Sequence, residues 1–347
     1  MEISELATIK PSEMADLIEL HYAMGKPAMF WGKAGIAKSS VFGQTADAMD
    51  LELLDIRMVH FDPVDMKGLM AVENNQTVWK TPAVWPTEGR GILLLDEFLS
   101  APRLTLAGSY SLILDRKIGS YVLPPGWVPF AASNYETDKG VTHKMPMPLA
   151  NRFSHYNVIE DIDDLVTYAL RTGWETEVIA FLRARPQLLH TYNPSETTEK
   201  AFATPRTWET VSDKVRHVKK NNGKFKALEY AMYSSDVGVG PAVEFSAFMN
   251  TFRKIPSRET ILMNPKKAKV PKESEPDALY AVCAGLAQIA NEDNIDQVVT
   301  YSNRLPNVFS VLLITDCLNR DESLSETIAI IEWQTMPEHS SVVLGRR

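Results

Sequence analysis

Short apolar runs alternate with amphipathic segments through the first 160 residues of the chain. The runs dense in apolar residues predict buried strands at residues 28–31, 53–59, 92–95, 128–132 and 155–159. Apolar residues at helical spacing predict helices at 12–24, from 39 to about 49, and at 102–115. Because strands that alternate with helices form parallel sheets, this pattern predicts an α/β domain with a five-stranded parallel sheet.

The pattern changes beyond residue 160, where helical periods dominate. Helices are predicted at 162–170, 174–184, 205–220, 226–233, 242–253, 277–291, 294–303, 307–317 and 323–332. A loop at 263–276, rich in proline and lysine, is expected to divide this all-α region. We therefore predict three parts, which are residues 1–160, 161–262 and 263–347.

Two inserts interrupt the α/β pattern. Residues 61–80 predict a turn, a short helix and a hairpin through Asn74-Asn75. Residues 116–127 predict a β-segment that ends at a Pro-Pro-Gly turn.

Composition narrows the class of protein. A formal net charge of −8 argues against a general nucleic-acid binder, which is usually basic. The apolar runs are too short to cross a bilayer, and the first residues carry no export signal. Two cysteines without CxxC spacing suit a reducing cytoplasm, and the seven histidines show no zinc spacing. We expect a cytoplasmic protein without membrane insertion.

The first candidate site is a phosphate-binding loop between the strand 28–31 and the following helix. Its residues are Gly32, Lys33, Ala34, Gly35, Ile36, Ala37, Lys38 and Ser39. Backbone N–H groups of such a loop converge on phosphate oxygens, and the helix N-terminus adds a favourable dipole. Lys38 is then expected to contact the outer phosphates of ATP, and the Ser39 hydroxyl to bind Mg²⁺.

The loop has alanine where glycine normally precedes the lysine. Ala37 is acceptable there if its backbone is already helical, whereas its methyl group would otherwise crowd the phosphates. An ordinary turn followed by a helix is the alternative reading of the loop, because short motifs also occur by chance.

The second candidate site is the acidic pair that follows the buried strand 92–95. Ligands of parallel sheets bind beyond the carboxyl ends of the strands, so Asp96 and Glu97 are expected near the loop. Asp96 is predicted to hold Mg²⁺ and Glu97 to activate the attacking water. The alternative, that the acids cap the next helix, is less favoured because Ser100 can serve as that cap.

The order of these elements over residues 25–215 resembles the MoxR branch of the AAA+ ATPases. The segments that carry this resemblance, besides the loop and the acidic strand, are 61–68 (FDPVDMKG), 85–91, 116–127, 131–134 (AASN), 146–153 (PMPLANRF) and 203–208 (ATPRTW). The C-terminal region beyond about 235 matches only loosely, as does Ala37.

The resemblance implies roles for three further residues. Asn134 would be a sensor that positions the lytic water, although an Asn-Tyr turn is the simpler reading. Arg152 would act as an arginine finger on the neighbouring subunit, whereas its alternative is a surface ion pair with Glu160 or Asp161. Arg206 would be a second sensor in a helical lid at 161–262. A cation at a helix start opposes the helix dipole, which favours a bound anion there.

The function implied is Mg²⁺-dependent ATP hydrolysis by a ring of like subunits, expected to be a hexamer. The resemblance further implies remodelling or maturation of a client protein, with a von Willebrand factor A-domain protein as partner and the inserts facing the pore or the client. Two alternatives stay open. One is a nucleic-acid motor or loader. It is slightly favoured by a cluster of cations, although a solvated helix end is the simpler explanation of that cluster, whose residues are 214, 216, 219, 220, 224 and 226. The other is a nucleotide-gated assembly protein with weak hydrolysis.

Overall fold

The computed structural model describes residues 6–138, 143–193, 200–222, 224–252 and 255–336. The chain forms two compact units, of which the first ends at Asp161 and the second begins at Ile162. Each unit has its own apolar core.

The first unit is built on one parallel sheet. Its strand order is β1-β10-β2-β9-β6-β3, and every neighbouring pair in it is parallel. The strands are β1 (Ala7–Ile9), β2 (Ala28–Trp31), β3 (Glu52–Arg57), β6 (Arg90–Asp96), β9 (Gly126–Ser133) and β10 (Ser154–Val158). The predicted α/β class with a parallel sheet is confirmed, but the sheet has six strands in place of five. The sequence pattern missed β1 because this edge strand is three residues long and buries only Ile9.

Successive residues of each strand point to opposite faces of the sheet, and apolar residues occur on both. Helices therefore cover both faces. On one face, Phe30 and Leu94 pack with apolar residues of α1 (Pro11–Met24) and α2 (Lys38–Ala48). On the other, Met29 and Leu95 pack with residues of α4 (Arg103–Asp115). Strands β2, β6 and β9 are buried on both sides, and their carboxyl ends lie next to one another.

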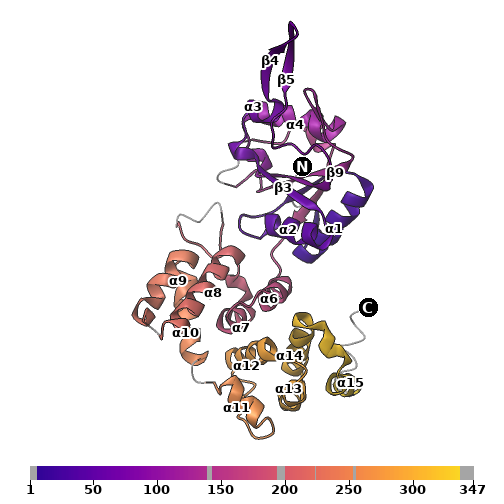
Figure 1. Cartoon of the computed structure of the whole chain (residues 1–347). Coiled ribbons are helices and arrows are strands. Elements are labelled where there is room, and N and C mark those ends of the chain that lie inside the picture. Colours follow the sequence, from indigo (N-terminus) through magenta and orange to yellow (C-terminus); the bar gives the residue numbers. More distant parts are fainter. Residues whose placement is uncertain (1–5, 139–142, 194–199, 223, 253–254, 337–347) are drawn as a thin grey trace. The chain divides into compact units, whose positions relative to one another are not determined.

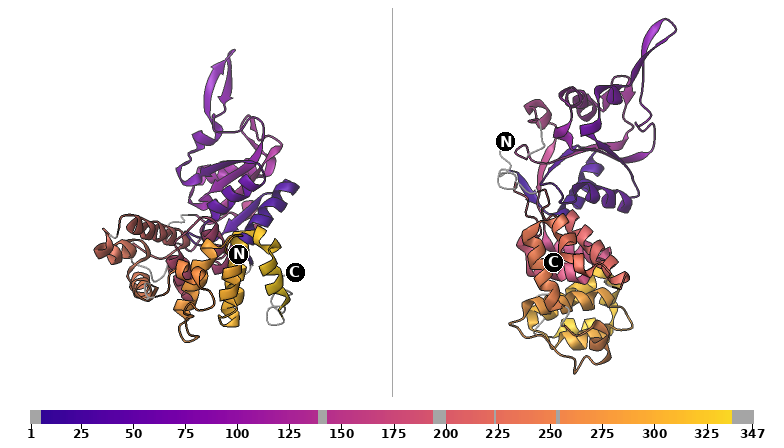
Figure 2. Two further views of the ribbon diagram at one scale, coloured as in Figure 1. Left: turned by 60° about the horizontal axis from the view of Figure 1, so that its bottom comes forward. Right: turned by 90° about the vertical axis from the view of Figure 1, so that its left-hand side faces the viewer.

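The predicted hairpin of the first insert stands apart from the sheet. Strand β4 (Leu69–Glu73) pairs antiparallel with β5 (Gln76–Lys80), after the short helix α3 (Pro63–Lys67). Asn74 and Asn75 both have positive φ angles, of 50° and 62°, as a type I′ turn requires. Figures 1 and 2 show the hairpin projecting from the first unit, and its side chains Met70 and Val72 are 65% and 77% exposed. The second insert forms a smaller hairpin from β7 (Lys117–Ile118) and β8 (Tyr121–Val122).

The described part of the second unit is helical. Its elements are α6 (Ile162–Arg171), α7 (Thr176–Ala184), α8 (Pro205–Lys220), α9 (Glu229–Val237), α10 (Val239–Phe252), α11 (Arg258–Met263), α12 (Pro276–Ile289), α13 (Ile295–Ser302), α14 (Asn307–Arg320) and α15 (Ile328–Thr335). One apolar core runs through these helices, from Val166 to Trp333. Helix α11 was missed by the sequence pattern, and residues 322–326 form a 3₁₀ turn where an α-helix was predicted. Among the described residues, no helix is both long and apolar enough to cross a membrane.

A buried ion pair lies inside this helical core. The Arg183 guanidinium donates two hydrogen bonds of 2.5 Å to the two carboxylate oxygens of Asp316. The two side chains are 7% and 0% exposed, so each charge depends on the other for its stabilisation.

We predict that Asp316→Asn lowers the free energy of unfolding by about 3–5 kcal/mol, because it leaves the Arg183 charge buried without a counter-ion. The half-exposed pair of Arg185 and Asp277 provides the control, and Asp277→Asn should cost no more than about 1 kcal/mol. Urea unfolding followed by circular dichroism measures both variants. Equal midpoints for the two variants would contradict the prediction.

Candidate nucleotide-binding site

The predicted phosphate loop joins the end of β2 to the start of α2, at the carboxyl edge of the sheet. Gly32 is confined there, because a Cβ atom would lie 2.5 Å from the Ile36 side chain and 2.7 Å from the Val158 carbonyl oxygen. Gly35 has a φ of +80°, which glycine adopts without strain. The loop therefore needs glycine at both positions, and it packs against the end of β10.

Ala37 does not have the helical backbone expected from the sequence. Its φ is +69° in the left-handed region, and it is the N-cap residue of α2 without a side-chain cap. Glycine is the usual residue for this conformation, which costs an alanine about 1–2 kcal/mol. Ala37 is thus a strained position, and the condition under which the sequence made an alanine acceptable there is not met.

Lys38 is held at the loop by three oxygen atoms. Its ammonium donates to the Gly32 and Lys33 carbonyl oxygens at 2.7 and 3.0 Å, and to Oδ1 of Asn134 at 3.2 Å. Asn134 follows the last residue of β9, the strand next to β2. Lys38 and Asn134, both predicted site residues, are therefore in contact, and Lys38 is 8% exposed. An Asn134 side chain bound to Lys38 is not simply the residue of a turn.

Ser39 and Asp96, the two residues predicted to bind Mg²⁺, are in contact. The Ser39 hydroxyl donates to Oδ2 of Asp96 at 2.7 Å, and the Glu97 backbone N–H donates to Oδ1 at 2.8 Å. Among the described residues no three His, Cys, Asp or Glu side chains group to hold a metal alone. Mg²⁺ at a nucleotide commonly takes one or two protein oxygens and completes its shell with phosphate and water. The hydroxyl and carboxylate together fit that pattern.

Glu97 adopts a left-handed conformation, with a φ of +52°, and its side chain is 41% exposed. Its carboxylate lies 3.6 Å from the guanidinium of Arg57, the last residue of β3. It makes no cap hydrogen bond to the 3₁₀ turn that follows, so the capping reading of the acidic pair is not supported. The expected cap Ser100 lies inside that turn, and α4 begins after Pro102 instead.

The charges around this strand end act on one another. Partial desolvation raises the pKa of the Asp55 carboxyl, and the carboxylates of Asp96 and Glu97 raise it further, while Arg57 opposes the shift. A divalent cation among these three acids would relieve their repulsion.

Arg152 follows the short helix α5 (Met147–Ala150) and precedes β10. Its guanidinium donates to the Pro148 carbonyl oxygen, and it forms no ion pair within the part of the chain that the structure describes. Glu160, the carboxylate suggested as its partner, instead binds Lys33 of the loop at 2.7 Å. The surface ion pair with Glu160 is therefore excluded.

Arg206 lies at the second position of α8 and is exposed. Thr204 is the N-cap residue and accepts a hydrogen bond from the Thr207 backbone, with Pro205 in the first turn, as the sequence indicated. Arg206 belongs to the second compact unit, and its role as a sensor stays a prediction.

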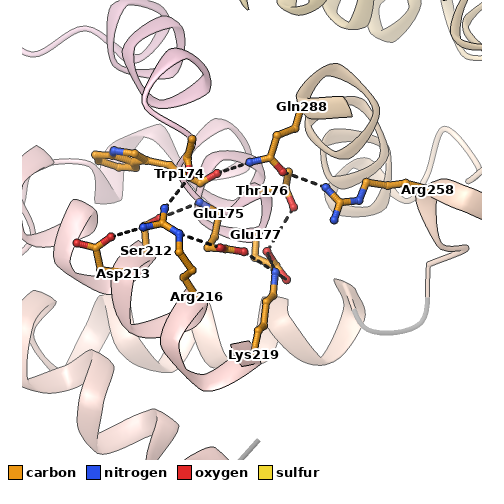
Figure 3. Close-up of polar contacts among 11 residues, drawn as sticks. Trp174, Glu175, Thr176, Glu177, Ser212, Asp213, Arg216, Lys219, Arg258 and Gln288 are labelled. Atoms are coloured by element: carbon orange, nitrogen blue, oxygen red, sulfur yellow. Dashed lines mark hydrogen bonds and ion pairs between the residues drawn. The ribbon is translucent and has the colours of Figure 1, made fainter. Parts of the chain in front are cut away.

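Three of the six cations in the predicted basic cluster, all on α8, pair with carboxylates of their own unit. Lys219 contacts the carboxylates of Glu175 and Glu177, and Arg216 contacts that of Glu175 (Figure 3). Lys214 pairs with Asp236. Half of the predicted cluster therefore serves to join α8 to its neighbours and does not favour a nucleic-acid interface.

Comparisons with known proteins do not establish a family. No protein-family model matches the chain, and a search of curated proteins found no match. A variant of RuvB from Thermotoga maritima is 16% identical over 83% of each chain, with a TM-score of 0.39. An ATPase from Cytophaga hutchinsonii, so named by inference, is 15% identical over 99% of this chain and 92% of its own, with a TM-score of 0.35. NtrX from Brucella abortus in complex with ADP is 14% identical over 96% of this chain and 67% of its own, with a TM-score of 0.35. Because these scores are below 0.5, function is inferred from the site alone.

We predict that Ala37→Gly stabilises the loop and strengthens nucleotide binding, because glycine relieves the left-handed strain at this position. The expected gain in affinity is up to about tenfold, since about 1.4 kcal/mol corresponds to a factor of ten. Titration with a fluorescent ATP analogue measures it.

Ala34→Gly is the matched control, because Ala34 is in the same loop without a positive φ. It should weaken binding slightly through the added freedom of the unbound loop. Equal effects of the two substitutions would mean that the backbone at Ala37 carries no strain.

Proposed function

We propose that this protein is an Mg²⁺-dependent ATPase. The observation that carries the proposal is the meeting of Lys38 and Ser39 with Asn134 and Asp96 at the carboxyl ends of three neighbouring parallel strands. An ordinary turn followed by a helix does not require a buried lysine, a serine–carboxylate pair and a neutral amide at one edge of a sheet.

Each residue has a stated task in the proposed reaction. The backbone N–H groups of the loop and the Lys38 ammonium bind the phosphates, while Ser39 and Asp96 hold Mg²⁺. Mg²⁺, when bound, neutralises charge that develops on the phosphate oxygens. Glu97 accepts a proton from the attacking water, for which its solvent contact is suited. Asn134 orients that water through its amide.

We further propose that the active form is a ring, with hexamer as our first expectation, in which Arg152 completes the site of the next subunit. Arg152 is a cation that forms no ion pair within the described chain, which supports this role. Head-to-tail contacts that close give rings. Two buried and unbridged cysteines support a reducing compartment such as the cytoplasm.

Remodelling or maturation of a client protein is the proposed use of the hydrolysis energy, with a von Willebrand factor A-domain protein as first candidate partner. The exposed apolar side chains of the β4–β5 hairpin support contact with another protein. Arg206 is proposed to sense the bound phosphate from the helical unit.

We predict that Glu97→Gln retains ATP binding but hydrolyses ATP at least about a hundredfold more slowly, because the amide cannot accept the proton. Phosphate release and nucleotide titration measure the two properties. Glu52 is the first residue of β3, whereas Arg57, which contacts Glu97, is the last. Glu52→Gln is therefore the control and should keep normal turnover. Normal turnover of Glu97→Gln would refute the assignment, and negligible turnover of the unmodified chain would favour the nucleotide-gated assembly protein.

We predict that Arg152→Ala alone loses hydrolysis by about a thousandfold, the lower range for a missing arginine finger. Mixing it with Glu97→Gln subunits, which supply Arg152 but cannot hydrolyse ATP, should restore part of the activity. Phosphate release from mixtures at several ratios measures this rescue. If no ratio gives more activity than the separate variants, Arg152 does not act between subunits.

A further inference from the structure

A partly buried histidine, His155, connects the strand that precedes the phosphate loop to the segment that carries Arg152. Trp31 is the last residue of β2, directly before Gly32, and its indole Nε1 donates to Nδ1 of His155 at 3.0 Å. Nε2 of His155 lies 2.8 Å from the Ala150 carbonyl oxygen. An indole N–H can only donate, so Nδ1 is the acceptor, and the proton on Nε2 is donated to Ala150. Only one tautomer of the neutral ring satisfies both partners.

The neutral form of this ring is favoured by its surroundings. Burial lowers the pKa of His155, although the hydrogen bond to Ala150 opposes the shift. The ring thus works near neutral pH as an uncharged link with one acceptor and one donor.

The carbonyl that receives this hydrogen bond lies two residues before Arg152. Ala150 ends α5, and the same helix supplies the Pro148 carbonyl oxygen that binds the Arg152 guanidinium. Any displacement of α5 therefore displaces Arg152 with it.

Aromatic packing reinforces the link. His155 stacks on Trp31, with ring centroids 5.9 Å apart, and Phe153 contacts the His155 ring edge at 6.1 Å. Phe153 in turn meets Phe98, the residue after Glu97, at 5.9 Å. Trp31, Phe98 and Phe153 are all at most 8% exposed. The end of β2, the acidic strand end and the Arg152 segment thus share one packed cluster.

We propose that Trp31, His155 and the Ala150 carbonyl form a relay that sets the position of Arg152 according to the nucleotide at the same subunit's loop. The relay rests on the proposed function, because Arg152 then serves the neighbouring site. His155 is a positioning residue, and its effect appears in the neighbour's reaction. A ring with this relay hydrolyses ATP in a coordinated order, since each loop controls the arginine that its neighbour needs.

Two variants break the relay at different bonds. His155→Asn keeps an acceptor near Nδ1 for Trp31 but does not reach Ala150, whereas His155→Gln reaches Ala150 but loses the acceptor for Trp31. Both should bind ATP with an affinity within about twofold of the unmodified chain. Both should lower kcat by about a hundredfold, the scale for a misplaced catalytic group.

The deciding experiment places His155→Gln in either member of the mixed ring. In the first mixture, Arg152→Ala subunits are combined with Glu97→Gln/His155→Gln subunits, so the defective relay lies in the subunit that donates Arg152. In the second, Arg152→Ala/His155→Gln subunits are combined with Glu97→Gln subunits, so it lies in the subunit that hydrolyses ATP. We expect rescue to fall at least about tenfold in the first mixture and to stay unchanged in the second.

His21→Gln is the matched control in both positions, because the His21 ring also makes hydrogen bonds through both nitrogens, one of them from Nε2 to Tyr156 of β10 at 2.9 Å. It should leave rescue unchanged. Equal rescue in the first and second mixtures, whether high or low, would overturn the relay and leave His155 a structural residue. A different outcome is that Arg152→Ala and Glu97→Gln subunits, both with His155 intact, show no rescue. That result would refute the proposed action of Arg152 between subunits, and the relay with it.

Discussion

The parallel register of β2, β9 and β6 is the constraint on which the rest of the site depends. Trp31 pairs with Ser133, and Leu95 pairs with Ala131, so the three strands end almost level. The residues that follow each strand, which are the loop, Asn134 and the acidic pair, must then converge. A shift of one residue in any of these strands would turn Asp96 or Asn134 away, because successive side chains point to opposite faces.

The charges at these strand ends also favour a particular kind of ligand. The buried Lys38 ammonium contacts two loop carbonyls and one amide oxygen, and it places a positive charge at the end of β2. Three carboxylates gather at the neighbouring strand ends, with Arg57 as a cation among them. A triphosphate with its divalent cation matches both halves of this distribution, which is why the arrangement favours a nucleotide over a simple anion.

The sequence predicted the residues whose role is local. Lys38, Ser39 and Asp96 were expected at one edge of the sheet and lie there, because a glycine-containing loop and an acidic strand end are recognisable in short windows. Arg57 and His155 were missed, since nothing nearby in sequence marks a residue that acts through a partner about 40 or 120 positions away. Their only signal was a charged or polar residue within or at the start of a predicted strand. The left-handed backbone of Ala37 could not be predicted, because alanine itself does not favour that conformation.

The β4–β5 hairpin has a consequence for the local energetics of the molecule. Its ten strand residues form ladder hydrogen bonds with each other, the Trp79 carbonyl also accepts a long one from the Ser120 hydroxyl, and most of their side chains are exposed. A solitary two-stranded ribbon in water is marginally stable. Its amide protons should thus exchange with solvent by frequent local opening, while those of β6 are released only when the whole unit unfolds. A binding partner that added a strand to either free edge of the hairpin would slow that exchange. Binding would therefore stabilise the hairpin.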